Sequence, residues 1–475
     1  MVEPRLAAAA LLLAAGVPMS AHAQQGNELE AIRKQIDELK SNYETTIRAL
    51  EQRLKDAEAA AARADAKATQ AQAQAASSPA SPAQPGDAAR NGNAPASTSS
   101  TFNPGISLIL QGSYRHFGED PGERGVTGYL PAGEFDLGER GFSLDESEIT
   151  VSANVDHLFY AQATFALEDG GIEVEEAYAL TPALGHGLTL KFGRFFSGIG
   201  YENALHPHAR DFLDPALPQN VLLGGNFAMD ALQVKWIAPL PVLVELGGEI
   251  GMPAEYPFED TDSNKNGITG GTLFANVGGD IGLSHSYRLG AWYLRAQNRV
   301  EDASILDLDE RFDTGMSTLS DGHTQMWGLN VVYKWAPDGN PQYRNVKFVA
   351  EWYQRRLDGE LTTDVGGAAD SGSFEARQSG WYLQGVFQFL PQWRAGLRYD
   401  RLDEGSYDLA ANLDGLIAPA DFNPRRWSAM LDWNPSEYSR IRLQYTQDKT
   451  QDGMTDDQFF LQYILSLGAH GAHKF

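Results

Sequence analysis

Apolar residues occupy every second position in segments of roughly ten residues from residue 106 to the end of the chain. In residues 457–467, for example, Phe459, Leu461 and Tyr463 alternate with polar residues such as Gln462. Successive side chains of a β-strand point to opposite faces, so this period indicates strands with one apolar and one polar face. The pattern predicts an all-β domain over residues 105–475.

Two classes of connection alternate between these segments. The short ones include residues 155–157, 239–240, 284–286, 390–392 and 434–436. The long polar ones include residues 117–143, 196–228, 254–270, 299–322, 357–378 and 403–424. Short turns at one rim and long loops at the other are typical of an outer-membrane β-barrel.

The spacing predicts a transmembrane barrel of sixteen antiparallel strands around an aqueous lumen. The strands are expected near residues 105–115, 144–154, 158–167, 172–180, 187–195, 229–237, 241–251, 271–283, 287–297, 323–335, 346–356, 379–389, 393–401, 425–433, 439–448 and 457–467.

Tryptophans near strand ends favour this barrel over a soluble β-sandwich, which remains the alternative. Aromatic girdles at the two membrane interfaces account for them, whereas a sandwich core does not need them. They are Trp236, Trp335, Trp352, Trp393, Trp427 and Trp433. The final residue, Phe475, is the aromatic end expected of a barrel that the assembly machinery inserts into outer-membrane lipid.

Three segments precede the barrel. Residues 1–23 combine Arg5, an apolar run and Ala21-His22-Ala23, which predicts a cleaved secretory leader. Residues 28–76 repeat apolar positions every three or four residues, which predicts a periplasmic coiled-coil helix and hence an oligomer. A lone amphipathic helix on the membrane is the alternative. Residues 77–104 are rich in Ser, Pro and Ala and predict a flexible linker.

Charge narrows the function classes. The net charge is −26 and there is no basic run, which argues against a nucleic-acid partner. Residues 101–475 carry 27 Lys or Arg and 52 Asp or Glu. Cysteine is absent, so no disulfide framework is available.

Parity along the strands assigns charged residues to the lumen. The first half of the barrel is predicted to be acidic inside, through Glu148, Glu173, Glu175, Glu245, Glu249 and Asp280 against Lys191 and Lys235. The second half is predicted to be basic, through Arg295, Lys334, Lys347, Arg355, Arg394, Arg398, Arg426, Arg440 and Arg442 against Glu351, Asp400, Asp432 and Asp448. Opposed walls predict a transverse field across the pore. The alternative is a solvated wall that selects nothing.

Two charges fall on the lipid face by parity, Glu176 and Arg194. A bulge near Glu176, placement of Arg194 at the rim, or burial of both at a subunit interface would each explain them.

The loop over residues 196–228 is a candidate to fold inward and narrow the pore. Its constriction candidates are Glu202, His206, His208, Arg210 and Asp211. His206 and His208 are also candidate zinc ligands, with Glu202, Asp211 and Asp214 nearby. Simple polar packing of the loop is the alternative. No cofactor is expected.

The chain resembles the phosphate-selective porin O/P family. The resemblance spans the leader, the coiled coil and the barrel. Its strongest pieces are Phe142–Asn154, Val174–Tyr178, Leu190–Phe196 and Ala469–Phe475. It implies a trimeric outer-membrane channel. Phosphate selectivity is not carried over, because the wall arginines are accompanied by strongly acidic loops.

Three functional hypotheses follow. The first is a porin for passive diffusion of small hydrophilic solutes or ions, located in the outer membrane as a homotrimer. The second is a zinc-uptake channel that uses the loop histidines. The third is a structural barrel whose arm tethers the envelope to the peptidoglycan layer. Nothing in the sequence indicates catalysis.

Overall fold

The computed structural model describes residues 104–119, 125–129, 132, 138–168, 171–182, 184–254, 256, 267–298, 317–363, 370–413 and 421–468. All of these belong to one compact unit, Ala94–Phe475. The predicted leader, the coiled coil, the linker up to residue 103 and Phe475 lie outside the described residues. Among the described helices, none is long and apolar enough to cross a membrane.

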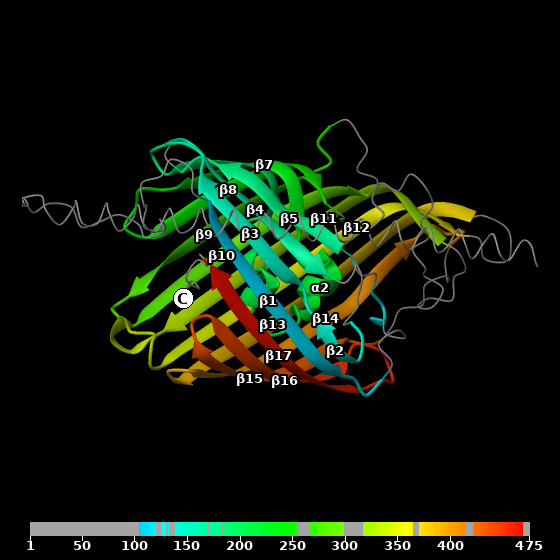
Figure 1. Ribbon diagram of the computed structural model, residues 1–475. Coiled ribbons are helices and arrows are strands. Elements are labelled where there is room, and N and C mark those ends of the chain that lie inside the picture. The colour runs from blue at the N-terminus through cyan, green and yellow to red at the C-terminus, as the bar shows by residue number, and fades with distance from the viewer. Residues whose placement is uncertain are drawn as a thin grey trace, which may run out of the picture. The chain divides into compact units, whose positions relative to one another are not determined.

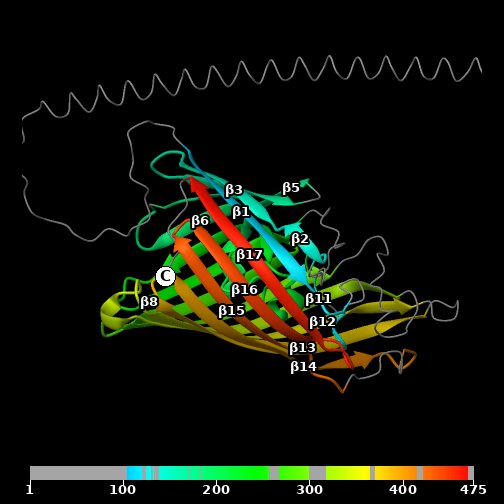
Figure 2. The same ribbon diagram turned by 60° about the horizontal axis from the view of Figure 1, so that its bottom comes forward.

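The described strands form one closed antiparallel ring (Figures 1 and 2). Each strand pairs with its neighbours in the chain, and β1 closes the ring by pairing with β17, from Ser107 opposite Gly468 to His116 opposite Phe459. On its other side β1 pairs with β2 and then β3, which together occupy one position in the wall. The ring therefore has the sixteen strand positions that the sequence predicts.

The strands in chain order are β1 Gly105–His116, β2 Gly141–Leu144, β3 Ser147–Asn154, β4 Tyr160–Glu168, β5 Gly171–Leu180, β6 Leu188–Phe196, β7 Ala228–Ile237, β8 Leu243–Pro253, β9 Gly270–Ile281, β10 His285–Asn298, β11 Ser317–Trp335, β12 Asn345–Thr363, β13 Asp370–Leu390, β14 Trp393–Leu409, β15 Arg425–Ser436, β16 Ser439–Lys449 and β17 Asp456–Gly468.

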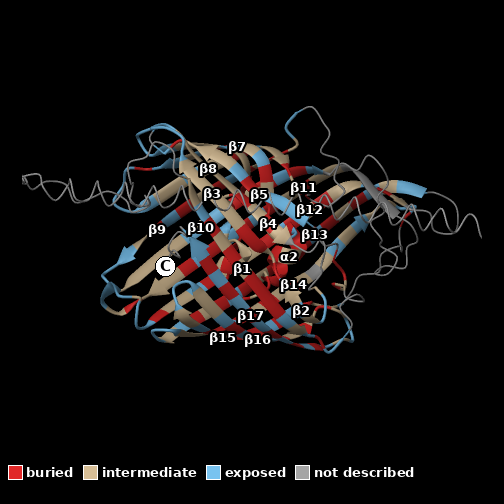
Figure 3. Cartoon of the chain, viewed as in Figure 1, coloured by how far each residue is buried: buried red, intermediate tan, exposed pale blue. Residues whose placement is uncertain are grey.

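The outer face of the wall is apolar. On β17, Leu461, Tyr463 and Leu465 are exposed on the outside, whereas Gln458 and Gln462 are buried inside. Figure 3 shows the same alternation of buried and more exposed residues along β16 and β17. This arrangement inverts that of a soluble sandwich, whose large apolar side chains would face inward.

Aromatic side chains pack against each other on the outer face at two levels. At the ends with short turns, Trp393 stacks on Trp433, with ring centroids 6.1 Å apart. Towards the long loops, Tyr399 contacts Trp427 at 4.4 Å, and Trp381 contacts Tyr399 at 5.4 Å. Two such levels are expected where a barrel wall meets the two surfaces of a membrane.

Three predicted loops are shorter than expected, because the strands continue into them. The ladder between β12 and β13 runs unbroken to Thr363 opposite Asp370, so most of residues 357–378 is hairpin rather than loop. β14 extends to Leu409, and β11 already begins at Ser317. The turn-forming and polar residues there obscured an alternation in which Leu357 and Phe374 face inward and are buried.

β5 contains a bulge at Glu175. Thr164 of β4 pairs with Glu176, and the next residue, Phe165, pairs with Val174, so Glu175 is the extra residue. A bulge lets two consecutive side chains point to the same side of a strand. Glu175 and Glu176 consequently both face the lumen, which corrects the assignment of Glu176 to the lipid face. Arg194 does lie outside, in an exposed double contact with Asp230 (2.8 and 3.0 Å) near the long-loop rim.

The lumen between β9 and β14 holds an apolar core as well as charges. Trp292 and Leu294 of β10 and Met326 of β11 point inward and belong to the same buried cluster as the apolar residues of the helix α2 Leu217–Leu223. Since Leu289 and Tyr293 cover the outer face, β10 is apolar on both faces. Parity therefore failed there: Arg295, predicted in the lumen, is exposed on the outer face.

Single cysteines test the two faces directly, since the chain has none of its own. Lys235→Cys replaces a lumen residue and Val234→Cys its outward neighbour. We expect a water-soluble thiol reagent to label Lys235→Cys in membranes, and only a lipid-soluble reagent to label Val234→Cys. Equal labelling of both by the water-soluble reagent would contradict the barrel orientation.

Candidate functional site

The connection between β6 and β7, residues 197–227 (loop L3), lies across the lumen (Figure 1). It contains two short 3-10 helices, η2 Glu202–Ala204 and η3 Pro207–Ala209, followed by α2. α2 ends at Gly224, whose φ of 73° lies in the left-handed region that glycine adopts without strain. The apolar side of α2 rests on β12, β13 and β14.

One end of L3 is held by the acidic wall through His206. Its Nδ1 lies 3.1 Å from Glu175 Oε2 and 3.3 Å from Glu148 Oε2, and its Nε2 lies 3.1 Å from Glu176 Oε2. Burial opposes a charge on His206, but the three carboxylates outweigh burial and raise its pKa well above the ordinary value. Both ring nitrogens thus lie at hydrogen-bond distance from a carboxylate oxygen, an arrangement that favours the imidazolium.

His208 contacts the same wall. Its Nδ1 lies 2.6 Å from Glu148 Oε1, and its ring stacks on that of His206 with centroids 5.9 Å apart. The other oxygen of Glu176, Oε1, accepts the Phe196 backbone N–H (3.1 Å) and lies 3.6 Å from Lys191 Nζ, so this carboxylate is held in place. The acidic side chains of the wall thus lie between Lys191 of the wall and the histidines of the loop.

Two buried glutamates of the wall bind the backbone at the start of L3. Glu249 accepts hydrogen bonds from the Ser197 hydroxyl and from Gly198 N–H (2.9 Å). Glu351 accepts from the backbone N–H groups of Tyr201 (3.0 Å) and Glu202 (2.9 Å). These contacts satisfy donors of an irregular backbone that has no strand partner.

The other end of L3 is held by the basic wall through two buried aspartates. Asp211 lies 2.6 Å from Lys347 Nζ and 3.5 Å from an Arg394 nitrogen. Burial alone would raise the pKa of Asp211, but Lys347 and Arg394 lower it below its ordinary value.

Asp214 lies 2.7 Å from Arg398 and 2.9 Å from Arg426, and its pKa is lowered in the same way, against the effect of burial. The backbone of L3 adds to this anchor, since Arg440 donates to the His208 carbonyl (3.1 Å) and Arg442 to that of Arg210 (3.0 Å).

L3 therefore neutralises much of the predicted transverse field. Its histidines face the acidic wall and its aspartates face the basic wall. Arg398 and Arg442 are 1% exposed, and Arg355 is fully buried beside Gln378, so these three no longer line open lumen. Of the predicted basic wall, Lys347, Arg394 and Arg440 keep partial exposure.

The acidic wall is divided in the same manner. Glu148 and Glu249 are 2% exposed and fully engaged, whereas Glu173 is exposed. Glu245 pairs with Lys235 at 3.3 Å. Glu175 contacts His206 and keeps 12% of its side chain exposed.

Two of the five constriction candidates lie inside L3 rather than on its open side. The Glu202 carboxylate accepts the Ala216 backbone N–H (3.1 Å), and Arg210 donates to Asn226. Both residues are buried. His206, His208 and Asp211 contact the barrel wall as described above.

The three acidic residues that the sequence suggests as zinc partners do not lie beside the histidines as a group. Glu202, Asp211 and Asp214 face other partners, and the carboxylates beside His206 are Glu148 and Glu175. The alternation along the strands places Glu148 and Glu175 on the lumen wall. It cannot predict that they contact a residue of the loop.

A cavity of about 210 Å³ opens beneath L3 at the side of the short turns. Arg394, Arg440 and His208 line it together with Tyr438 and Glu437 of a turn. The partly exposed guanidinium groups of the basic wall thus face space open to solvent.

Comparison with known proteins gives one relative in sequence. A protein of Aquifex aeolicus (strain VF5), described as an uncharacterized protein, is 30% identical over 399 residues, which cover 79% of this chain and 80% of that protein. The chain belongs to the family of this Aquifex protein. No family model matches this chain.

Among solved structures the chain is similar to outer-membrane proteins. The in-vitro folded OmpT of Vibrio cholerae (trimer form) is 10% identical with a TM-score of 0.47, over 77% of this chain and 99% of that chain. The outer-membrane channel DcaP of Acinetobacter baumannii is 14% identical with a TM-score of 0.44, over 77% and 97%. OprB of Pseudomonas putida is 13% identical with a TM-score of 0.44, over 77% and 94%.

Removing Asp214 tests the anchor on the basic wall. Asp214→Ala leaves Arg398 and Arg426 buried with Asp400 as their remaining shared carboxylate. We expect this loss to cost up to about 3–5 kcal/mol, the range for breaking a buried pair. As a control, Asp230→Ala breaks the exposed contact with Arg194, which we expect to cost no more than about 1 kcal/mol. Urea unfolding in lipid bilayers, followed by tryptophan fluorescence, measures both. Equal values would contradict the anchoring role.

The same variant predicts a pH profile. The folded pKa of Asp214 lies below its ordinary value of 3.8, so the stabilisation is complete above that value and is lost as the pH falls through the folded pKa. The stability difference between the wild type and Asp214→Ala should stay constant from neutral pH to about 5 and shrink in stronger acid. A difference that already disappears at mildly acidic pH would count against the ion pairs.

Proposed function

We propose that the protein is an outer-membrane porin through which small hydrophilic solutes or ions diffuse passively. The observation that carries this proposal is the closed ring of sixteen strands, apolar outside and charged inside, with L3 anchored across the lumen. An apolar outer face suits lipid, since the closed ring pairs each strand with its neighbours and so satisfies the backbone along the ladders.

L3 sets the character of the channel in this proposal. Because it pairs with both walls, it keeps its position and leaves part of the lumen open. Charges that retain exposure, such as Glu245 on one side and Arg394 on the other, then act on a passing solute from opposite directions.

The proposal includes a homotrimer surrounded by outer-membrane lipid, which the resemblance to the porin O/P family supports. It stops short of phosphate as the solute. A phosphate pathway needs a series of unpaired arginines, and here Arg398 and Arg442 are buried against Asp214 and Asp432. The roles of Phe475 in assembly and of the N-terminal arm at the peptidoglycan layer stay predictions on residues outside those described.

Planar bilayer recording tests the channel itself. We expect the purified full-length protein to insert and produce stable stepwise conductance in KCl. Heat-dependent migration on gels checks that the protein is folded. Folded protein that inserts into the bilayer but produces no conductance steps would overturn the proposal.

Reversal potentials in a KCl gradient test the two walls. Glu245→Gln removes an acidic wall charge and should shift the preference towards anions. Arg394→Gln removes a basic charge on the opposite wall and should shift it towards cations. Shifts in the same direction, or none in either variant, would leave the wall charges without a role in selectivity.

A further inference from the structure

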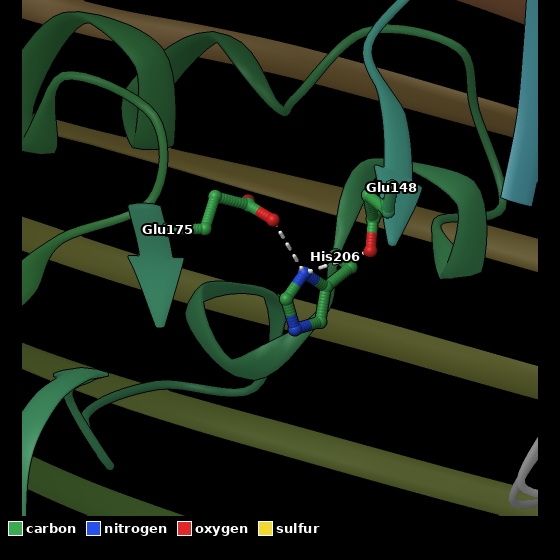
Figure 4. Close-up of side chains that lie close together, drawn as sticks. All are labelled: Glu148, Glu175 and His206. Carbon is green, nitrogen blue, oxygen red and sulfur yellow. Dashed lines mark hydrogen bonds and ion pairs between the residues drawn. The ribbon is translucent and has the colours of Figure 1, made fainter. Parts of the chain in front are cut away.

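Three segments far apart in the chain bring metal-ligating atoms together on the acidic side of the lumen. Glu148 comes from β3, Glu175 from the bulge of β5 and His206 from L3 (Figure 4). One ligand atom of each lies within 4.8 Å of the others. In Figure 4 both carboxylates point at the same edge of the imidazole ring.

Two of the three ligand-to-ligand distances suit a small tetrahedral ion, and the third, between the two carboxylates, is within 4.8 Å. Bonds of 2.0–2.2 Å to nitrogen and oxygen give ligand-to-ligand edges of about 3.3–3.5 Å in a tetrahedral zinc site. His206 Nδ1 lies 3.1 Å from Glu175 and 3.3 Å from Glu148. We propose that Glu148, Glu175 and His206 bind one divalent transition-metal cation such as Zn²⁺, with water at the fourth corner.

The surroundings of His206 support this site independently of its three ligands. The other ring nitrogen, Nε2, lies 3.1 Å from Glu176 Oε2. A carboxylate behind a ligating histidine fixes the ring and raises its basicity, and such arrangements are usual around zinc. Glu176 is itself held by the Phe196 N–H and Lys191, so the ring orientation is set by the barrel wall.

The charge of the cluster matches a dication. Glu148, Glu175 and Glu176 bring three negative charges and Lys191 one positive charge, which leaves two to be balanced. A bound dication balances both.

The mixed nitrogen and oxygen ligands also select the kind of ion. Imidazole suits zinc, nickel and related transition metals, whereas Ca²⁺ and Mg²⁺ prefer sites made of oxygen only. His208 lies beside the site and holds the second oxygen of Glu148 at 2.6 Å, which orients that carboxylate.

A bound ion would join β3, β5 and L3 at one point. This role rests on the proposed channel, since it makes the metal a clamp on the loop that narrows the pore. The binding site itself depends only on the three ligands.

Zinc titration of the purified full-length protein tests the site. The tail histidines His470 and His473 are replaced by alanine throughout, so that they cannot contribute. We expect one Zn²⁺ per chain, no competition from Mg²⁺, and at least about tenfold weaker binding in Glu175→Gln and in His206→Ala. His157→Ala, in a short turn, is the matched control and should bind zinc as the parent does.

Folding is checked for each variant by heat-dependent gel migration, and Co²⁺ supplies a second readout in the parent protein. Four-coordinate Co²⁺ with nitrogen and oxygen ligands absorbs strongly in the visible range, and this band should be absent in His206→Ala.

A dissociation constant on the order of 100 µM or weaker in the parent, or undiminished binding in His206→Ala, would overturn the site. Channel recordings in a chelator are run in parallel. Conductance without zinc binding would contradict the metal site and leave the proposed channel intact. Absent conductance would contradict the proposed channel.

Discussion

The pairing of β1 with β17 is the contact on which the rest of the structure depends. It joins the two ends of the described barrel through ten consecutive residue pairs, so the sheet closes into a ring instead of ending in two edge strands. A wall without edges has all its backbone donors and acceptors satisfied, and its outer face is then free to be apolar. Closure therefore sends the apolar side chains outward and leaves the lumen as the place for charged ones.

Charges inside such a wall are partly removed from water and need partners of opposite sign. L3 supplies them on both sides. His206 lies among three wall glutamates, and Asp211 and Asp214 lie among lysine and arginine side chains. A loop with only one sign of charge would be repelled from one wall. The mixed charge of L3 is what allows it to span the lumen.

Two departures from regular β-structure shape the lumen. The bulge at Glu175 turns an extra carboxylate inward, which creates the triple acidic contact with His206. The inward apolar residues of β10, such as Trp292 and Leu294, join the buried cluster that contains α2. Both features break the simple alternation of the strands, and both lie where the loop meets the wall. Local exceptions to a folding rule are often found at functional sites.

The sequence by itself determined the barrel, its sixteen strands and the face of nearly every wall charge, because a period of two is a local property of the chain. It went wrong for Glu176, which the bulge of β5 turns inward, for Arg295, where both faces of β10 carry apolar residues, and for hairpins that continue into polar segments. Only the tertiary structure decided which charges stay exposed and which are paired. Glu148, Glu175 and His206 come from three separate segments, and no local period relates them. Their meeting depends on barrel closure, on one bulge and on the path of L3 through the lumen.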